Sequence, residues 1–130
     1  MVTKNRAIRD FMITIPVTAD ENASLATAVR LIRHYNIRHL PITHEGKLSG
    51  IVFARDLEAV LKVHEVDQEE ESIQLIINRH PVHVEPDAPL KEVLDEMVHK
   101  KYEAVIVQDA GKILGVFTVI DALKILRDLL

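Results

Sequence analysis

The chain has 130 residues, of which 48% are hydrophobic and 28% charged, and its formal net charge is −4 at pH 7. This composition is typical of one globular domain, and the acidic balance argues against a nucleic-acid partner. The absence of cysteine excludes disulfides, thiolate metal sites and a cysteine nucleophile. Because no apolar run reaches the ~20 residues of a membrane span and no signal peptide is apparent, we expect a cytoplasmic protein without a membrane partner.

The first half of the chain predicts a helix, a short strand, a second helix, two strands and a final helix. The helices are indicated by apolar residues at i, i+3, i+4 and i+7. Two apolar runs joined by a turn that contains Gly46 indicate a β-hairpin. The patterns that can be located lie, in chain order, at residues 7–12, 25–32, 39–43, 48–53 and 57–61.

The second half repeats this order after a shift of 65 residues without a gap. Its patterns lie at residues 73–77, 90–97, 104–108, 113–118 and 122–129. Asn22 and Asp87 precede the two central helices as candidate N-caps, and Pro89 suits a first helical turn. The repeat predicts an α/β (α+β) fold of two repeats, 1–65 and 66–130, each a small mixed sheet with flanking helices.

A repeat of this size buries too little surface to be stable alone. We therefore expect the two repeats to pack about a pseudo-two-fold axis, to share one core and to form one intertwined module.

The phrase "GIVFARD" (Gly50–Asp56) recurs as "GVFTVID" (Gly115–Asp121) inside this pattern of helices and strands. On this phrase, and on the segments 12–57 and 78–123 that contain it, the chain resembles a tandem pair of cystathionine β-synthase (CBS) domains, also called a Bateman module. The resemblance implies a regulatory module, not an enzyme, that binds an adenine nucleotide or S-adenosylmethionine in the cleft between the repeats. It further implies a homodimer that signals to an effector protein.

The phrase has a chemistry of its own. The Asp121 carboxylate could accept both hydroxyls of a ribose, and Thr118, one turn earlier, could donate to a phosphate or sugar oxygen. Both residues lie where a strand gives way to a helix, whose N-terminus attracts anions. Alternatively, the aspartate serves only as a first-turn or capping residue. The first repeat has Phe53 in place of the threonine, which predicts one competent site and one degenerate site. Alternatively, the phenyl ring offers a stacking face to a base, and the second site is occupied in a different way.

The resemblance assigns further residues to the site that contains Asp121: Ile15, Pro16, Val17 and Asp20, with the backbone of Ile37 and Arg38 at the adenine edge. Arg38 and His39 are either phosphate ligands or an exposed pair at the edge of a strand.

The weaker second site would combine Asp56 with Arg55, His80 and Tyr102. Glu85 and Glu103 would repel a phosphate there. The seven histidines show no metal-binding spacing, and no catalytic motif is present, so neither a metal nor a catalytic cofactor is expected. A ligand-free dimerisation or scaffolding module is the alternative function.

Overall fold

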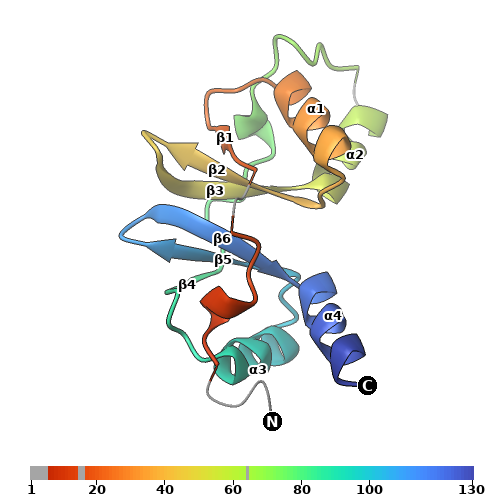
Figure 1. Cartoon of the computed structure of the whole chain (residues 1–130). Coiled ribbons are helices and arrows are strands. Elements are labelled where there is room, and N and C mark those ends of the chain that lie inside the picture. The colour runs from red at the N-terminus through yellow and green to blue at the C-terminus, as the bar shows by residue number, and fades with distance from the viewer. Residues whose placement is uncertain (1–5, 15–16, 64) are drawn as a thin grey trace. The chain divides into compact units, whose positions relative to one another are not determined.

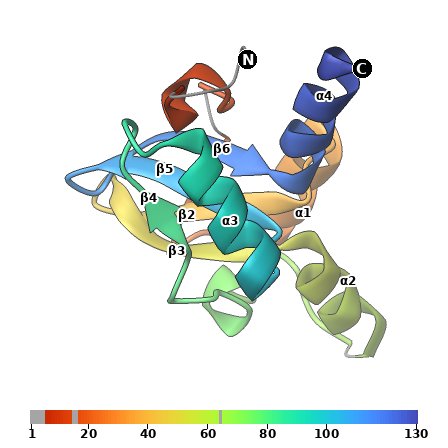
Figure 2. The same ribbon diagram turned by 90° about the horizontal axis from the view of Figure 1, so that it is seen from below.

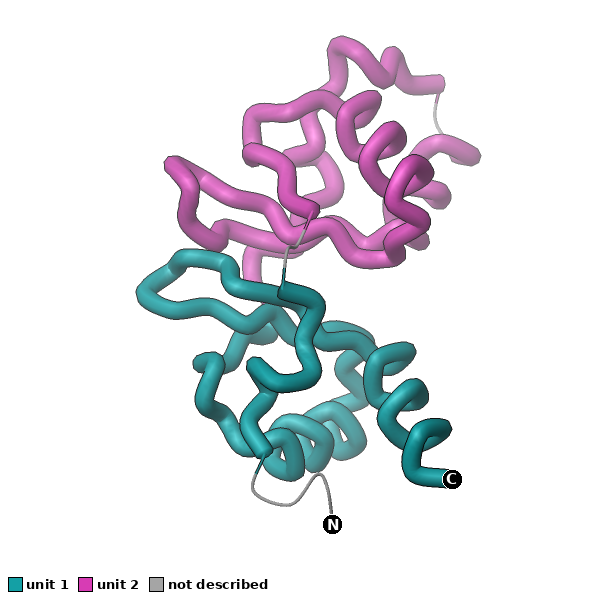
Figure 3. The backbone as a smooth tube through the Cα atoms, viewed as in Figure 1, with its two compact units in different colours: residues 1–16, 82–130 teal, residues 17–81 magenta. Residues whose placement is uncertain are grey.

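The computed structural model describes residues 6–14, 17–63 and 65–130, and these residues form two compact units. Unit 1 comprises residues 1–16 and 82–130, and unit 2 comprises residues 17–81 (Figure 3). Each described unit contains one three-stranded sheet and two α-helices (Figure 1). The predicted α/β class with two matching repeats is thereby confirmed.

Unit 2 begins with β1 (Ala19–Asp20), which pairs in parallel with β2 (His39–His44), and β2 pairs antiparallel with β3 (Lys47–Phe53). The predicted hairpin turn lies at Glu45 and Gly46, whose φ angles of 50° and 80° are those of a two-residue turn between twisted strands. The helices of the unit are α1 (Leu25–Tyr35), α2 (Ala54–Val63) and the 3-10 helix η2 (Ile73–Leu75).

Unit 1 has the same order. β4 (His83–Val84) pairs in parallel with β5 (Ala104–Asp109), which pairs antiparallel with β6 (Lys112–Thr118). Its helices are η1 (Ile8–Asp10), α3 (Leu90–Lys100) and α4 (Val119–Leu129). The helices expected at 7–12 and 73–77 are therefore single 3-10 turns, too short for a full α-helical turn.

Each unit has a hydrophobic cluster of its own, in which the apolar face of one helix covers a sheet. In unit 1 the buried side of α3 packs against β5 and β6, with Phe117 fully buried (Figure 2). In unit 2 the buried side of α1 packs against β2 and β3, and η2 contributes Ile73, which is also fully buried. A single core shared by both units remains a prediction.

Each unit is completed by a segment of the other sequence repeat, which we call its crossing segment. The crossing segment lies within residues 66–81 in unit 2 and within residues 6–14 in unit 1. In unit 2, Ile51 of β3 exchanges two backbone hydrogen bonds with Asn78, at 2.9 and 2.8 Å. In unit 1, Val116 of β6 exchanges the corresponding pair with Ile13, at 3.0 and 3.3 Å. A repeat of the sequence is thus not the same stretch of chain as a unit of the structure.

Two glycines make these pairings possible. A Cβ atom on Gly50 would collide with Ile77 and would lie 2.8 Å from the Asn78 carbonyl oxygen. A Cβ atom on Gly115 would lie 2.5 Å from the Ile13 carbonyl oxygen. Both distances are shorter than van der Waals contact, so the glycine of the repeated phrase allows the crossing segment to lie against the strand.

The N-caps predicted for the central helices are wrong. Ser24, not Asn22, caps α1, and its side chain accepts the Thr27 N–H at 3.2 Å. Pro89, not Asp87, is the N-cap of α3 and makes no side-chain capping bond. In both helices a backbone carbonyl of the crossing segment also accepts the N–H of the first helical residue, since Leu25 donates to the Glu71 carbonyl and Leu90 to the Arg6 carbonyl.

Candidate functional site

Thr118 and Asp121 lie where β6 passes directly into α4. The Thr118 N–H and hydroxyl both donate to Asp121 Oδ2, at 2.8 and 3.0 Å, and the Asp121 N–H donates to Thr118 Oγ1 at 3.3 Å. These bonds form a capping box. They hold an aspartate that is only 8% exposed in one orientation. The capping role considered for this aspartate is therefore present.

The capping box uses only one oxygen of the Asp121 carboxylate. Among the described residues, the other oxygen, Oδ1, has no hydrogen-bond partner, and no side-chain oxygen or nitrogen is both fully buried and unsatisfied. Oδ1 therefore remains accessible and can accept a hydrogen bond from a hydroxyl group. One carboxylate can cap the helix and contact a ligand at the same time.

The corresponding position in unit 2 has a different chemistry. Phe53 has no oxygen to accept the N–H of residue 56, and its ring contacts two side chains instead. The His39 ring meets it edge-on with centroids 5.6 Å apart, and the Arg55 guanidinium lies 4.7 Å from its centroid. Asp56 is exposed, in contrast to the buried Asp121. The phenyl ring thus replaces a polar cap with a packed cluster.

A hollow of about 430 Å³ lies in unit 2 beside Asp56. Its walls come from α2 and from the crossing segment that follows η2: Asp56, Ala59, Val60, Leu75, Ile76, Ile77 and Asn78. Five of the seven lining residues are apolar, the other two supply a carboxylate and an amide, and much of the exposed lining consists of polar atoms. Asn78 Oδ1 accepts the N–H of His80 at 2.8 Å, which fixes the amide. The hollow could hold a flat apolar group beside a carboxylate.

Sequence reasoning placed Asp56 at the weaker site and did not identify the hollow. Ile76 and Ile77, which line the hollow, were predicted from the sequence to belong to a helix. The pairing of Asn78 with Ile51 brings these two residues close to α2. The repeat contains one signal for this pairing. Asn78 matches Ile13 after the 65-residue shift, and the two residues make equivalent backbone pairs in the two units.

The other predicted residues divide between the units. Unit 2 contains Val17, Asp20, Ile37, Arg38, His39, Arg55, Asp56 and His80. Unit 1 contains Tyr102, Thr118 and Asp121, whereas Ile15 and Pro16 lie outside the described residues. Tyr102 packs against the hydrophobic cluster of unit 1, and its role as a ligand contact remains a prediction.

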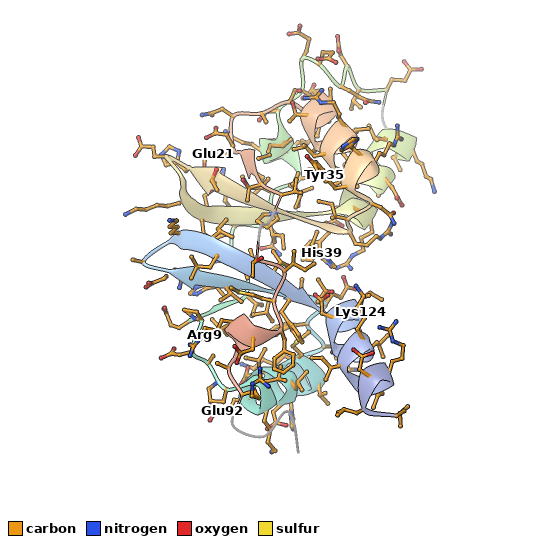
Figure 4. All side chains as sticks on the ribbon, viewed as in Figure 1. Arg9, Glu21, Tyr35, His39, Glu92 and Lys124 are labelled. Carbon is orange, nitrogen blue, oxygen red and sulfur yellow. The ribbon has the colours of Figure 1, made fainter. Side chains whose placement is uncertain are left out.

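Several residues of the unit 2 set already have partners within the chain. Asp20 Oδ1 accepts the Asn22 N–H at 2.9 Å, and an Arg38 guanidinium nitrogen lies 3.7 Å from a Glu58 carboxylate oxygen. The Arg38 carbonyl accepts the Ala54 N–H, which ties β2 to the start of α2. His39, labelled in Figure 4, packs on Phe53 as described above. The structure thus brings Arg38, His39 and Arg55 to the beginning of α2.

An ion pair not foreseen from the sequence joins β1 to the end of unit 2. The Arg79 guanidinium donates to Glu21 Oε1 at 3.0 Å, and His44 Nδ1 lies 3.5 Å from Glu21 Oε2. The Arg79 hydrogen bond is the main reason that the pKa of Glu21 lies below its ordinary value of 4.5. Burial opposes this shift, and Ser49 and His44 add to it. The pair stabilises the unit and shows no feature of a binding site.

The described residues contain neither a candidate metal site nor a candidate membrane span. No group of three or more histidine, aspartate or glutamate side chains could hold a metal ion. No helix in the described parts is long and apolar enough to cross a membrane.

Comparison with known proteins gives a match to one family model over most of the chain. The model of the CBS domain matches residues 8–62 and again residues 71–128. Two curated relatives are each 30% identical: an L-aspartate semialdehyde sulfurtransferase of Methanocaldococcus jannaschii, over 85% of this chain, and an A-adding tRNA nucleotidyltransferase of Aquifex aeolicus, over 93%. The chain spans only 21% and 14% of the lengths of these two relatives.

Solved structures of similar size match almost the whole chain. A Vibrio cholerae protein assigned to acetoin utilization has a TM-score of 0.85 at 29% identity, and the match covers 95% of this chain and 92% of that one. A CBS domain pair crystallised with 5′-methylthioadenosine and S-adenosyl-L-methionine has a TM-score of 0.84 at 28% identity, with 96% and 98% covered.

Proposed function

Because the chain belongs to the CBS domain family, we propose that it is a regulatory module that binds an adenine ligand and signals to a partner protein. The ligand is AMP, ADP, ATP or S-adenosylmethionine. A CBS pair 28% identical to this chain holds two adenine compounds, 5′-methylthioadenosine and S-adenosyl-L-methionine, which supports this ligand class. No catalytic step is proposed.

The observation that carries the proposal is the geometry of Asp121. Oδ2 is fixed by two hydrogen bonds from Thr118, while Oδ1 has no partner among the described residues. A carboxylate held in one orientation before the ligand arrives loses little freedom on binding. The positive end of the α4 dipole would favour a nearby phosphate. Thr118 and Asp121 therefore form the proposed ribose and phosphate end of the main site.

A second candidate site is the hollow beside Asp56. The side chains of Val60, Ile76 and Ile77 could contact an adenine ring, and the exposed Asp56 carboxylate suits a ribose. Arg55 contacts Phe53 at the start of the same helix. The sequence predicted this to be the weaker site, and that order remains part of the proposal.

A thermal-shift screen tests the proposal directly. AMP, ADP, ATP and S-adenosylmethionine are added in turn, and a ligand at about 100 times its dissociation constant stabilises the protein by about 2.7 kcal/mol. Guanosine and cytidine nucleotides of equal charge are the controls. A stabilisation by adenine compounds alone supports the proposal. Equal shifts in melting temperature with all nucleotides would indicate that the protein binds their negative charge and does not recognise the base.

The alternative function is a ligand-free dimerisation or scaffolding module. One observation favours it: exposed large apolar side chains gather on α4, namely Val119, Ile120, Leu123, Leu126 and Leu129. Exposed apolar surface of this kind marks protein contacts. We propose a homodimer under either function. If no adenine compound stabilises the protein, the scaffolding role is the function that remains.

A further inference from the structure

The described walls of the hollow beside Asp56 contain a single charged group. Its lining residues include one carboxylate, that of Asp56, and one amide, that of Asn78, and none of these described residues is a lysine, arginine or histidine. Asn78 Oδ1 accepts the His80 N–H at 2.8 Å, which leaves the amide nitrogen as a donor. The described walls therefore offer an acceptor, a donor and apolar side chains, but no cation for a phosphate.

The next turn of α2 determines the charge beside Asp56. Asp56 and Ala59 are three residues apart in this helix, so they lie on the same face of it. Ala59 is exposed and lines the hollow with a methyl group. A longer side chain at this position would reach a ligand held by Asp56, and the chain has the smallest side chain other than glycine there.

The corresponding position in unit 1 is a lysine. After the 65-residue shift Asp56 matches Asp121, and Ala59 matches Lys124. Lys124, labelled in Figure 4, lies on α4 one turn after Asp121 and on the same face. It is exposed and makes no ion pair or hydrogen bond with any described residue. Its ammonium group is therefore free to contact a phosphate on a ribose held by Asp121.

The two arginines at the beginning of α2 do not supply the missing cation. An Arg38 nitrogen lies 3.7 Å from a Glu58 carboxylate oxygen, and the Arg55 guanidinium lies 4.7 Å from the centroid of the Phe53 ring. Neither arginine belongs to the lining of the hollow. The two units thus differ in charge at the one helical position that follows the ribose-binding aspartate.

We propose that the hollow in unit 2 binds an adenine compound without a phosphate group, such as 5′-methylthioadenosine or S-adenosylmethionine, and that Ala59 determines this choice. Both sites present a carboxylate to the ribose, and a carboxylate repels a phosphate attached to that ribose. Lys124 offsets the repulsion in unit 1, whereas Ala59 leaves it in place in unit 2. The positive sulfonium of S-adenosylmethionine is instead attracted by Asp56. The inference rests on the proposed function and states which ligands the second site accepts.

Residue-resolved NMR titration of the full-length chain measures the two sites separately. The backbone amide signals of Ile77 and Asn78 report on the hollow, and those of Thr118 and Asp121 report on the site in unit 1. The compounds titrated are 5′-methylthioadenosine, S-adenosylmethionine and AMP. The comparison of these compounds in the wild type requires no variant.

Three variants test the role of Ala59. Ala59→Lys gives unit 2 the residue that unit 1 has at this position. Ala59→Met adds a side chain of similar length without a charge. Val63→Lys adds the same charge as Ala59→Lys at an exposed residue of α2 that does not line the hollow. Because lysine and methionine favour helices, α2 should form in all three variants, and the dispersion of the NMR signals confirms that each is folded.

In the wild type we expect 5′-methylthioadenosine and S-adenosylmethionine to bind the hollow with dissociation constants at least about tenfold below that of AMP. Ala59→Lys should reduce this ratio to about threefold or less, because the added ammonium attracts the phosphate and repels the sulfonium. Ala59→Met and Val63→Lys should keep the wild-type ratio.

AMP that binds the hollow as tightly as 5′-methylthioadenosine would overturn the inference. A ratio that Ala59→Lys leaves unchanged, or that Ala59→Met changes equally, would overturn it as well. Binding at Thr118 and Asp121 alone would also overturn it, although the proposed function would stand. If none of the three compounds shifts any signal, the proposed function itself is wrong and the inference is wrong with it.

Discussion

Thr118 and Asp121 cap α4 reciprocally, with the Thr118 N–H 2.8 Å from Asp121 Oδ2 and the Asp121 N–H 3.3 Å from Thr118 Oγ1. The same two side chains are the proposed contacts for a ribose and a phosphate. Stability and binding therefore depend on one pair of residues, and variants must separate the two effects.

Replacement of Asp121 by asparagine keeps an oxygen for the cap and removes the charge. We expect Asp121→Asn to lower the affinity for the adenine ligand at least about tenfold, because a charge-assisted hydrogen bond to a hydroxyl contributes roughly 1.5–3 kcal/mol. Asp56→Asn should lower it much less, because Phe53 takes the place of the hydroxyl in that repeat. Calorimetry measures both affinities.

Two further variants serve as controls for the cap. Thr118→Ala removes the capping oxygen and should lower the free energy of unfolding by about 1 kcal/mol. Thr118→Ser keeps the hydroxyl and should unfold with nearly the wild-type free energy. If Asp56→Asn weakens binding more than Asp121→Asn does, the ligand belongs to the hollow in unit 2 and the predicted order of the sites is wrong.

The glycines of the repeated phrase should not tolerate a methyl group. Gly50→Ala and Gly115→Ala place Cβ 2.8 Å from the Asn78 carbonyl oxygen and 2.5 Å from the Ile13 carbonyl oxygen. The crossing segment must then move away, and we expect each variant to lose roughly 1–3 kcal/mol of stability in urea unfolding. Lys47→Ala and Lys112→Ala, at the exposed starts of the same strands, are the controls. Wild-type stability in either glycine variant would show that the close approach is not required.

The Arg79 hydrogen bond to Glu21 should make unit 2 sensitive to acid. The pKa of Glu21 is lowered in the folded state, so its contribution to stability is present above pH 4.5 and is lost as the pH falls through the folded pKa. Glu21→Gln should therefore be less stable than the wild type at pH 7 and should lose less stability between pH 5 and pH 3. Glu69→Gln is the control, because it removes an exposed carboxylate that makes no ion pair with any described residue. Parallel stability curves for Glu21→Gln and the wild type would contradict this expectation.

Fragments should fold according to the units and not according to the sequence repeats. A fragment of residues 1–65 lacks the fully buried Ile73, the Asn78 partner of Ile51 and the Glu71 carbonyl that caps α1. We expect it to be largely unfolded by circular dichroism and to retain less helix than a fragment of residues 17–81, which keeps all three contacts. A cooperative transition in 1–65 would mean that the crossing segment contributes little.

Local signals were sufficient to predict much of the fold. The apolar runs around Gly46 and Gly111 predicted both hairpins, and helical spacing predicted α1 and α3, because each of these elements is specified by neighbours in the sequence. The crossing segments were not assigned to the opposite repeat, since the pairing of Asn78 with Ile51 joins residues far apart in the chain. The Arg79–Glu21 pair and the hollow beside Asp56 were not predicted for the same reason, because each joins residues that are far apart in the sequence. The N-cap predictions failed for local reasons, because the cap of α1 is Ser24, two residues after Asn22, and α3 begins directly after Pro89, which has no capping side chain.

The division into units has a mechanical consequence. Both ends of the chain belong to unit 1, and unit 2 is one continuous insertion between residues 16 and 82. Tension applied to the two ends passes through unit 1 alone for as long as Ile13 stays paired with Val116. In an optical trap we therefore expect the N-terminal segment to detach first and unit 2 to extend only afterwards, so unit 1 shields unit 2 from force.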